Sequence, residues 1–137
     1  MIPKRVLVTI LLLATSWGCG RADVSESYAH LDDRESAHHA LAATATPADM
    51  RAEAVTYGSD MTALMDDMRS QCAGMMGQSA GDLTGPMRTL VNDHCARLAN
   101  LEDPDAVRAE CDQHHERMRA ALDTMRQRVQ DAGLLGR

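Results

Sequence analysis

The sequence predicts an all-α protein, an antiparallel up-down four-helix bundle, and three observations lead to that class. Four stretches carry apolar residues three and four positions apart, which is the spacing of one helix face. Ala, Leu, Met, Arg, Glu and Gln dominate, and these are good helix formers. Aromatic residues make up only 2% of the chain and Phe is absent, whereas strands favour aromatic and β-branched residues. Short connections make successive helices antiparallel neighbours.

The first helix is expected over about residues 23–43, and a turn follows it. The second helix starts at Thr46 or Pro47, because proline is tolerated in the first turn of a helix. Its apolar stripe covers residues 50–75 and continues in phase across Gly58. We therefore expect one long helix here rather than two short ones.

The third helix is expected over about residues 86–100, with Thr84 as its N-cap. Four glycines between residues 74 and 85 indicate a loose connection before it. The fourth helix starts at Asp103 and Pro104, since Asp is a favoured N-cap and Pro a favoured first helical residue. It continues to the glycines near the end of the chain.

The N-terminal segment differs in kind from the rest. Lys4 and Arg5 precede an unbroken apolar run over residues 6–14, and small residues follow before Cys19. A basic start, an apolar stretch of about 7–15 residues and a small residue before the cleavage point are typical of a secretory signal. The run is too short to span a bilayer, which needs about 20 apolar residues. The sequence therefore predicts an exported protein.

With Gly18 directly before Cys19, this segment resembles a bacterial lipoprotein precursor. The resemblance implies a signal peptide over residues 1–18 and a cysteine, Cys19, that becomes the new N-terminus and carries palmitate and related acyl chains. Residues 19–22 then form the lipidated cysteine and a short tether, and residues 23–137 form the bundle. The resemblance covers only the N-terminal segment and identifies no family for the bundle.

The same resemblance implies a lipid-anchored protein of the cell envelope, attached to the membrane through its N-terminal lipid. Retention at the inner membrane usually requires an Asp after the lipidated cysteine. Gly20 occupies that place here, which favours the outer membrane, facing the periplasm. Ser16 and Trp17 stand where the family usually has Leu and a small or β-branched residue. An ordinary secreted protein, in which Cys19 is removed or paired, is the alternative.

Charge and missing motifs exclude several functions. Without Lys4 and Arg5, the chain has 12 basic and 20 acidic residues, a net charge of about −8, which is unsuited to nucleic acid or anionic lipid. The sequence has no Gly-rich phosphate loop and no Cys-x-x-Cys, so we expect no enzyme. A core of Met, Leu, Ala and Val specifies packing weakly. A protein partner or a homodimer would be a further source of stability.

Five polar residues fall on faces that should be buried. Glu35 and His38 lie on the first helix, His94 on the third, and Cys111 and His114 on the fourth. Up-down topology brings these positions together near one end of the bundle. Buried polar groups without partners cost about 1–3 kcal/mol each. A metal ion would resolve that cost, because imidazole and thiolate bind Zn and Cu, and facing helices of bundles build such sites.

The sequence therefore predicts a membrane-anchored periplasmic protein that binds Cu or Zn for sequestration, sensing or delivery. The predicted metal ligands are Glu35, His38, His94, Cys111 and His114. The alternative is a structural or partner-binding helical lipoprotein with no metal, whose histidines are solvated. In each of the pairs His38-His39 and His114-His115, one ring must point outward, because adjacent residues do not share a helix face.

The cysteines add a competing possibility. Antiparallel pairing of the last two helices places Cys95 opposite about residue 108, within one turn of Cys111. Because disulfides persist in oxidising compartments, a Cys95–Cys111 disulfide is predicted, and Cys72 lies several turns away. This disulfide and a Cys111 metal ligand exclude each other. If the disulfide forms, the metal site must use the histidines and Glu35 alone.

Overall fold

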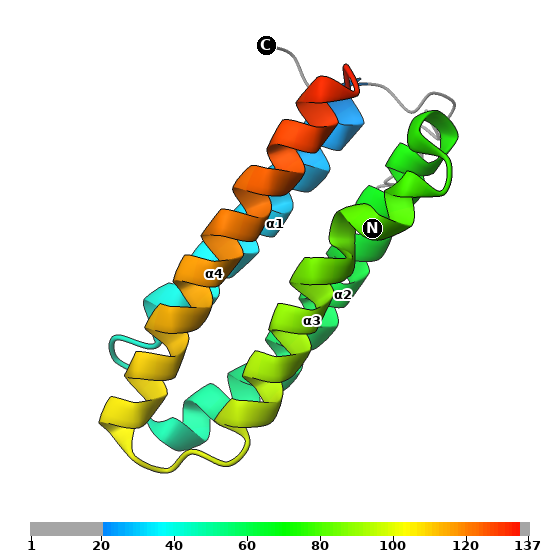
Figure 1. The fold of residues 1–137 in the computed structure, drawn as a ribbon. Coiled ribbons are helices and arrows are strands. Elements are labelled where there is room, and N and C mark those ends of the chain that lie inside the picture. Colours follow the sequence, from blue (N-terminus) through cyan, green and yellow to red (C-terminus); the bar gives the residue numbers. More distant parts are fainter. Residues whose placement is uncertain (1–20, 135–137) are drawn as a thin grey trace, which may run out of the picture.

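The computed structural model describes residues 21–134, apart from the side chains of residues 21–23 and 75, and they form four α-helices (Figure 1). The helices are α1 (Arg21–Leu41), α2 (Pro47–Met76), α3 (Ser79–Leu98) and α4 (Pro104–Asp131). Successive helices run antiparallel and pack as neighbours, and α4 returns beside α1. The predicted all-α four-helix bundle is confirmed.

The predicted signal peptide and the lipid on Cys19 fall outside the described residues. α1 begins at Arg21, within the stretch that the sequence assigns to a tether, residues 19–22. Within residues 21–134, none of the helices combines the length and apolar character that crossing a membrane would require.

The starts of α2 and α4 follow from their capping residues. Thr46 Oγ1 accepts a hydrogen bond from the Asp49 backbone N–H at 3.2 Å, and the Asp49 carboxylate accepts one from the Thr46 backbone N–H at 3.4 Å. This reciprocal pair is a capping box, and Pro47 occupies the first helical position. At α4, the Asp103 carboxylate accepts from the Ala106 backbone N–H at 2.9 Å. Both helix starts agree with the sequence.

α3 begins at Ser79, well before the predicted start at Pro86, and this is a correction. Only a short turn, with Gly77 at a φ of 58°, separates it from α2. Thr84, expected to be the N-cap, is instead a residue within α3. Its side chain is 1% exposed, and that of the neighbouring Leu83 is buried too. Burial of this extra segment against the core outweighs the local preference of glycine and proline for a turn.

A layer of buried polar residues divides the core into two apolar clusters. The larger cluster contains most of the buried methionines, among them Met61, Met65 and Met118. The smaller cluster lies toward the α1–α2 and α3–α4 connections and contains Ala42, Met50, Ala54, Leu98, Val107 and Cys111. On α1, α3 and α4, a buried histidine lies in the sequence between residues of the two clusters. The polar layer is therefore built by three helices at one height in the bundle.

Candidate metal centre

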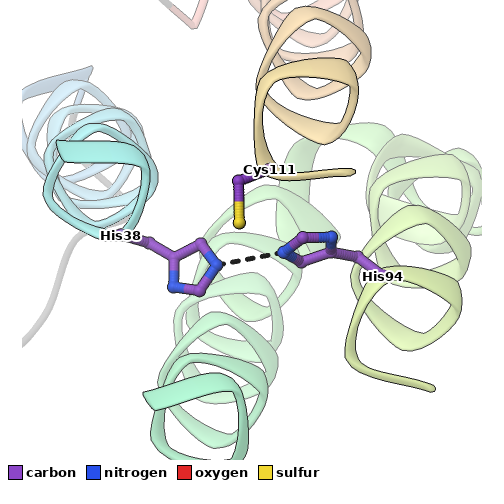
Figure 2. Close-up of side chains that lie close together, drawn as sticks. All are labelled: His38, His94 and Cys111. Carbon is purple, nitrogen blue, oxygen red and sulfur yellow. Dashed lines mark hydrogen bonds between the residues drawn. The ribbon is translucent and has the colours of Figure 1, made fainter. Parts of the chain in front are cut away.

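Three of the five predicted ligands converge in the polar layer: His38 from α1, His94 from α3 and Cys111 from α4 (Figure 2). Each residue is 1% exposed. Their candidate ligand atoms all lie within 4.8 Å of one another, and the two Nε2 atoms are 3.0 Å apart. Figure 2 shows the Cys111 sulfur pointing toward the space between the two rings. Two nitrogens on one tetrahedral zinc ion lie about 3.3 Å apart, given Zn–N bonds of about 2.0–2.1 Å. The site needs only a small adjustment to hold an ion.

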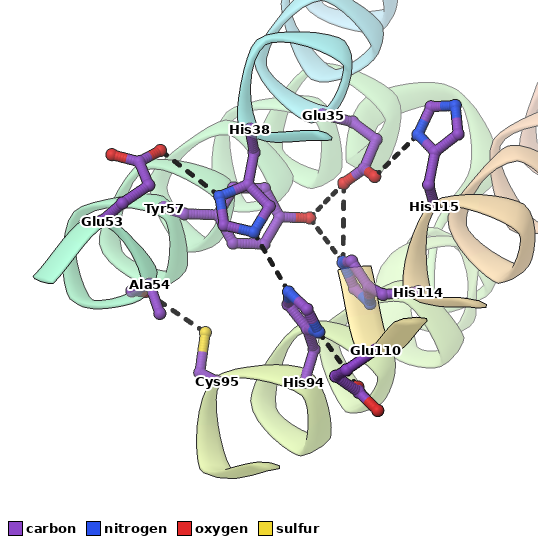
Figure 3. A network of polar contacts seen from close by, with 10 residues as sticks. All are labelled: Glu35, His38, Glu53, Ala54, Tyr57, His94, Cys95, Glu110, His114 and His115. Atoms are coloured by element: carbon purple, nitrogen blue, oxygen red, sulfur yellow. Dashed lines mark hydrogen bonds and ion pairs between the residues drawn. The ribbon is translucent and has the colours of Figure 1, made fainter. Parts of the chain in front are cut away.

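Each imidazole is oriented by a carboxylate on its other nitrogen (Figure 3). His38 Nδ1–H donates to Glu53 Oε1 at 3.3 Å, and His94 Nδ1–H donates to Glu110 Oε1 at 3.0 Å. An ionised carboxylate only accepts hydrogen bonds, so the proton of each neutral ring lies on Nδ1. In this tautomer both Nε2 atoms present lone pairs to each other across 3.0 Å.

Near neutral pH, neither ring takes up an additional proton that could form a hydrogen bond between the two Nε2 atoms. Burial lowers the pKa of both rings, although the hydrogen bond to Glu53 partly opposes the shift at His38. For His94, burial and the neighbouring His114 and His38 lower the pKa to about 2. Both rings are thus neutral at pH 7. A cation between the two Nε2 atoms is the group that would satisfy both lone pairs.

An arginine pairs with each orienting carboxylate. Arg34 lies 2.8 Å from Glu53 Oε1, and Arg97 lies 3.5 Å from Glu110 Oε2. The two histidines thus have matching surroundings, in which a partly exposed arginine holds a carboxylate and the carboxylate holds a ring. Outer partners of this kind are typical of metal-ligating histidines.

The Cys111 thiol is protonated when no ion is bound. Burial, together with the negative charges of Glu110 and Asp112, raises its pKa to about 11. A metal ion reverses this preference, because a coordinated thiol loses its proton. Binding of a metal ion by Cys111 would therefore release a proton.

The other two predicted ligands, Glu35 and His114, lie in an adjoining network around Tyr57 (Figure 3). The Tyr57 hydroxyl donates to Glu35 Oε2 in a short hydrogen bond and accepts from His114 Nε2–H at 2.8 Å. The other Glu35 oxygen accepts from His115 Nδ1–H at 3.1 Å. Burial alone would raise the Glu35 pKa, but hydrogen bonds from His114 and Tyr57 lower it to about 2. Protein donors thus occupy both oxygens of this carboxylate.

The network and the three-residue group are in contact through stacked rings. His114 stacks on His94 with ring centroids 3.8 Å apart and an interplanar angle of 7°. Tyr57 stacks on His38 at 3.9 Å and 17°. Burial and the charge of Glu35 raise the pKa of Tyr57, so its hydroxyl keeps its proton. The network therefore supports the rings of His38 and His94 from the side of the larger core cluster.

The predicted Cys95–Cys111 disulfide is not formed, and this is a correction. Both residues carry free thiols. Cys95 Sγ points to α2, where it donates to the Ala54 carbonyl at 3.2 Å and would lie 3.2 Å from a Cβ on Gly58. Cys111 instead points to the bundle interior beside His38. Because the two sulfurs face different neighbours, Cys111 remains a candidate ligand.

Sequence reasoning missed two residues of the site. Glu110, which orients His94, reads as an ordinary charged residue next to Cys111, although it lies one helical turn before His114. Tyr57 reads as one more member of the apolar stripe of α2, and only its hydroxyl belongs to the polar layer. A polar atom at the tip of an otherwise apolar side chain was the available signal for Tyr57.

Acid is expected to destabilise the metal-free protein from about pH 6.5 downward. His94 takes up a proton below its ordinary pKa of 6.5 in the unfolded chain, but only near pH 2 in the folded protein. The folded state therefore loses about 1.4 kcal/mol per pH unit in that window from His94 alone. His38 acts in the same direction, and Glu35 adds to the loss below its ordinary pKa of 4.5.

Urea unfolding at several values between about pH 5 and pH 7.5 measures this loss. His94→Asn keeps a donor toward Glu110 and cannot titrate, so its stability should depend less on pH. A wild-type stability that stays constant across the range would contradict the burial of neutral rings.

No known protein family, no curated protein and no solved structure matches this chain.

Proposed function

We propose that this protein binds a soft or borderline metal ion, copper or zinc, at His38, His94 and Cys111, and that it sequesters, senses or delivers that ion. One observation carries the proposal. Two imidazole lone pairs face each other across 3.0 Å beside a buried thiol, and a carboxylate fixes each ring through its other nitrogen. Metal-ligating histidines almost always have such a second contact.

The donor set selects the class of metal. Calcium and magnesium require oxygen ligands, whereas two imidazoles and one thiolate suit zinc and copper. A divalent ion with one thiolate carries one net positive charge. The carboxylates of Glu53 and Glu110, bonded to the two ligand rings, offset that charge inside the bundle.

Three protein ligands leave one coordination position for another group. Among the described residues, no fourth His, Cys, Asp or Glu belongs to the group, and α2 contributes Met50 and Ala54 to the cluster that contains Cys111. Structural zinc sites almost always have four protein ligands, while sites that exchange their fourth ligand have three. This difference favours a role in holding and passing on the ion over a purely structural role.

The proposed location is the cell envelope. Residues 1–20 resemble a lipoprotein precursor, so we propose a lipid on Cys19 that holds the bundle at the outer membrane, facing the periplasm. α1 begins at Arg21, which would leave the bundle close to the membrane surface. Labelled palmitate should be incorporated into the wild-type protein in cells and not into Cys19→Ser. Equal labelling of both would contradict the anchor.

A competition titration tests the metal site itself. Purified protein, kept reduced, competes with a chromophoric chelator for Zn²⁺ and, separately, for Cu⁺. Cys111→Ser should weaken binding by more than about 100-fold, because loss of an outer partner of a ligand already costs about 10–100-fold.

Cys95→Ser is the matched control. It removes a free thiol next in sequence to His94, and that thiol points to α2. This variant should bind like the wild type. A wild-type protein that takes no ion from the chelator, or equal weakening by both substitutions, would overturn the proposed site.

A further inference from the structure

We propose that the groove between α1 and α4 is the route by which the ion reaches and leaves the buried centre, with His39 and Asp112 as its first ligands. The inference rests on the proposed function. It adds a second, surface-exposed metal contact that acts on the rate of loading and not on the final affinity.

The centre requires a route because its ligands are closed off from water. His38, His94 and Cys111 are each 1% exposed. A hydrated ion must pass between two helices and shed its water before it meets them. The groove that serves this passage should lie directly over the ligands and should offer groups that replace water.

The α1–α4 groove meets the first requirement. It has a volume of about 300 Å³ and is lined by His39, Ala40, Ala42, Ala43, Arg108 and Asp112. Ala42 belongs both to this lining and to the buried cluster that contains Cys111. His39 and Asp112 are the direct sequence neighbours of His38 and Cys111. The groove therefore shares Ala42 with the cluster that contains Cys111, and two of its lining residues adjoin ligands in the sequence.

The groove also meets the second requirement, because its side chains are metal ligands by type. His39 Nε2 lies 2.9 Å from Asp112 Oδ1, so a cation that takes the place of the proton between them would contact both side chains. The side chains are 35% and 70% exposed, so solvent reaches both. Arg108, the cation in the lining, pairs with Asp105, and this carboxylate offsets its charge.

Ligand-type groups continue inward from the groove. His39 stacks on His115 with ring centroids 4.0 Å apart and an interplanar angle of 6°. His115 bonds to Glu35, which contacts His114, and His114 stacks on the ligand His94 (Figure 3). Imidazoles and carboxylates thus line the seam between α1 and α4 from the surface to the centre.

The groove between α2 and α3 is the competing route. It is larger, about 420 Å³, and it also approaches the centre at Ala54 and Cys95. Its lining contains no imidazole and no carboxylate, and the Cys95 thiol in that lining already donates to the Ala54 carbonyl. Asn92 in its wall provides a substitution that tests this route separately.

The test measures rates and affinity in the same full-length proteins. Co²⁺ is the probe, because its thiolate-to-metal absorption reports ligation by Cys111, and stopped-flow mixing follows loading and release to a chelator. His39→Ala and Asp112→Asn should slow both processes by about tenfold, since charged and polar clefts raise the association rates of their ligands by factors of 10 or more. The dissociation constant should stay unchanged, because both rates fall together. His30→Ala, an exposed histidine elsewhere on α1, is the matched control and should load like the wild type.

The outcomes separate the two proposals. Wild-type protein without a thiolate band contradicts the metal centre itself and the route with it. Normal affinity with wild-type rates in both groove variants overturns the route alone, as does slowing by Asn92→Ala in their place. A loss of affinity in His39→Ala without slower loading also overturns it, because His39 would then belong to the centre.

Discussion

Zinc at a hundredfold excess over its dissociation constant is expected to raise the melting temperature of the protein by about 10 °C. An ion that binds only the folded state adds about 2.7 kcal/mol at that concentration, and a domain of this size shifts by roughly 4 °C per kcal/mol. The unfolded chain holds no such site, because 56 residues separate His38 from His94. Thermal melting followed by circular dichroism, with and without Zn²⁺, measures the shift.

His38→Asn tests whether the shift comes from this centre. The Asn amide keeps a donor toward Glu53 and removes Nε2, so the variant should fold and lose most of the shift. His30→Asn, on the same helix and exposed, should retain it. A shift of wild-type size in His38→Asn would place the bound ion elsewhere.

The second large effect concerns the carboxylates behind the two histidines. Glu53→Gln and Glu110→Gln should each weaken zinc binding by about tenfold, and the double variant by about 100-fold. Each substitution removes the charge that makes a ligand ring more basic and fixes its Nδ1 proton. The chelator competition assay measures these affinities.

Glu116→Gln is the matched control for the carboxylate variants. Glu116 is exposed on α4, the helix that also carries Glu110, and should have no effect on affinity. Wild-type affinity in the double variant would show that the two carboxylates hold the bundle together and do not act on the metal.

The fold was predictable where local signals and burial agree. Thr46 and Asp103 start helices in the structure as they do in the sequence, because each side chain satisfies a backbone N–H that no helix bond can reach. At the start of α3, the local sequence signals and burial favour different structures. The glycines and Pro86 favour a turn, but Leu83 and Thr84 gain more from burial. The free energy gained by this burial depends on packing against the other helices, so it cannot be predicted from the sequence of the segment alone.

The site was predictable to the level of the helix face. Periodicity placed His38, His94 and Cys111 toward the interior, and topology placed them at one end. The same periodicity placed Glu35 and His114 toward the interior as well, because residues three apart share a helix face. Three residues also advance about 4.5 Å along a helix axis. This offset puts Glu35 and His114 beside the Tyr57 hydroxyl, to which both are hydrogen-bonded, and not between the two facing lone pairs.

The prediction of a Cys95–Cys111 disulfide was wrong for a related reason. Antiparallel register places Cys95 and Cys111 at similar heights, but it does not fix the direction of either sulfur. Cys95 follows His94 directly, so the two side chains leave α3 about 100° apart. The histidine takes the interior direction, and the thiol is left to face Ala54 on α2.

X-ray absorption spectroscopy of the zinc-loaded protein is the direct test of a metal centre at His38, His94 and Cys111, because it counts the atoms bound to the ion. We expect one sulfur at about 2.3 Å together with nitrogen ligands at about 2.0–2.1 Å that show imidazole scattering. The sulfur should disappear in Cys111→Ser and remain in Cys95→Ser. A first shell of oxygen and nitrogen without sulfur in the wild-type protein would contradict a metal centre at His38, His94 and Cys111.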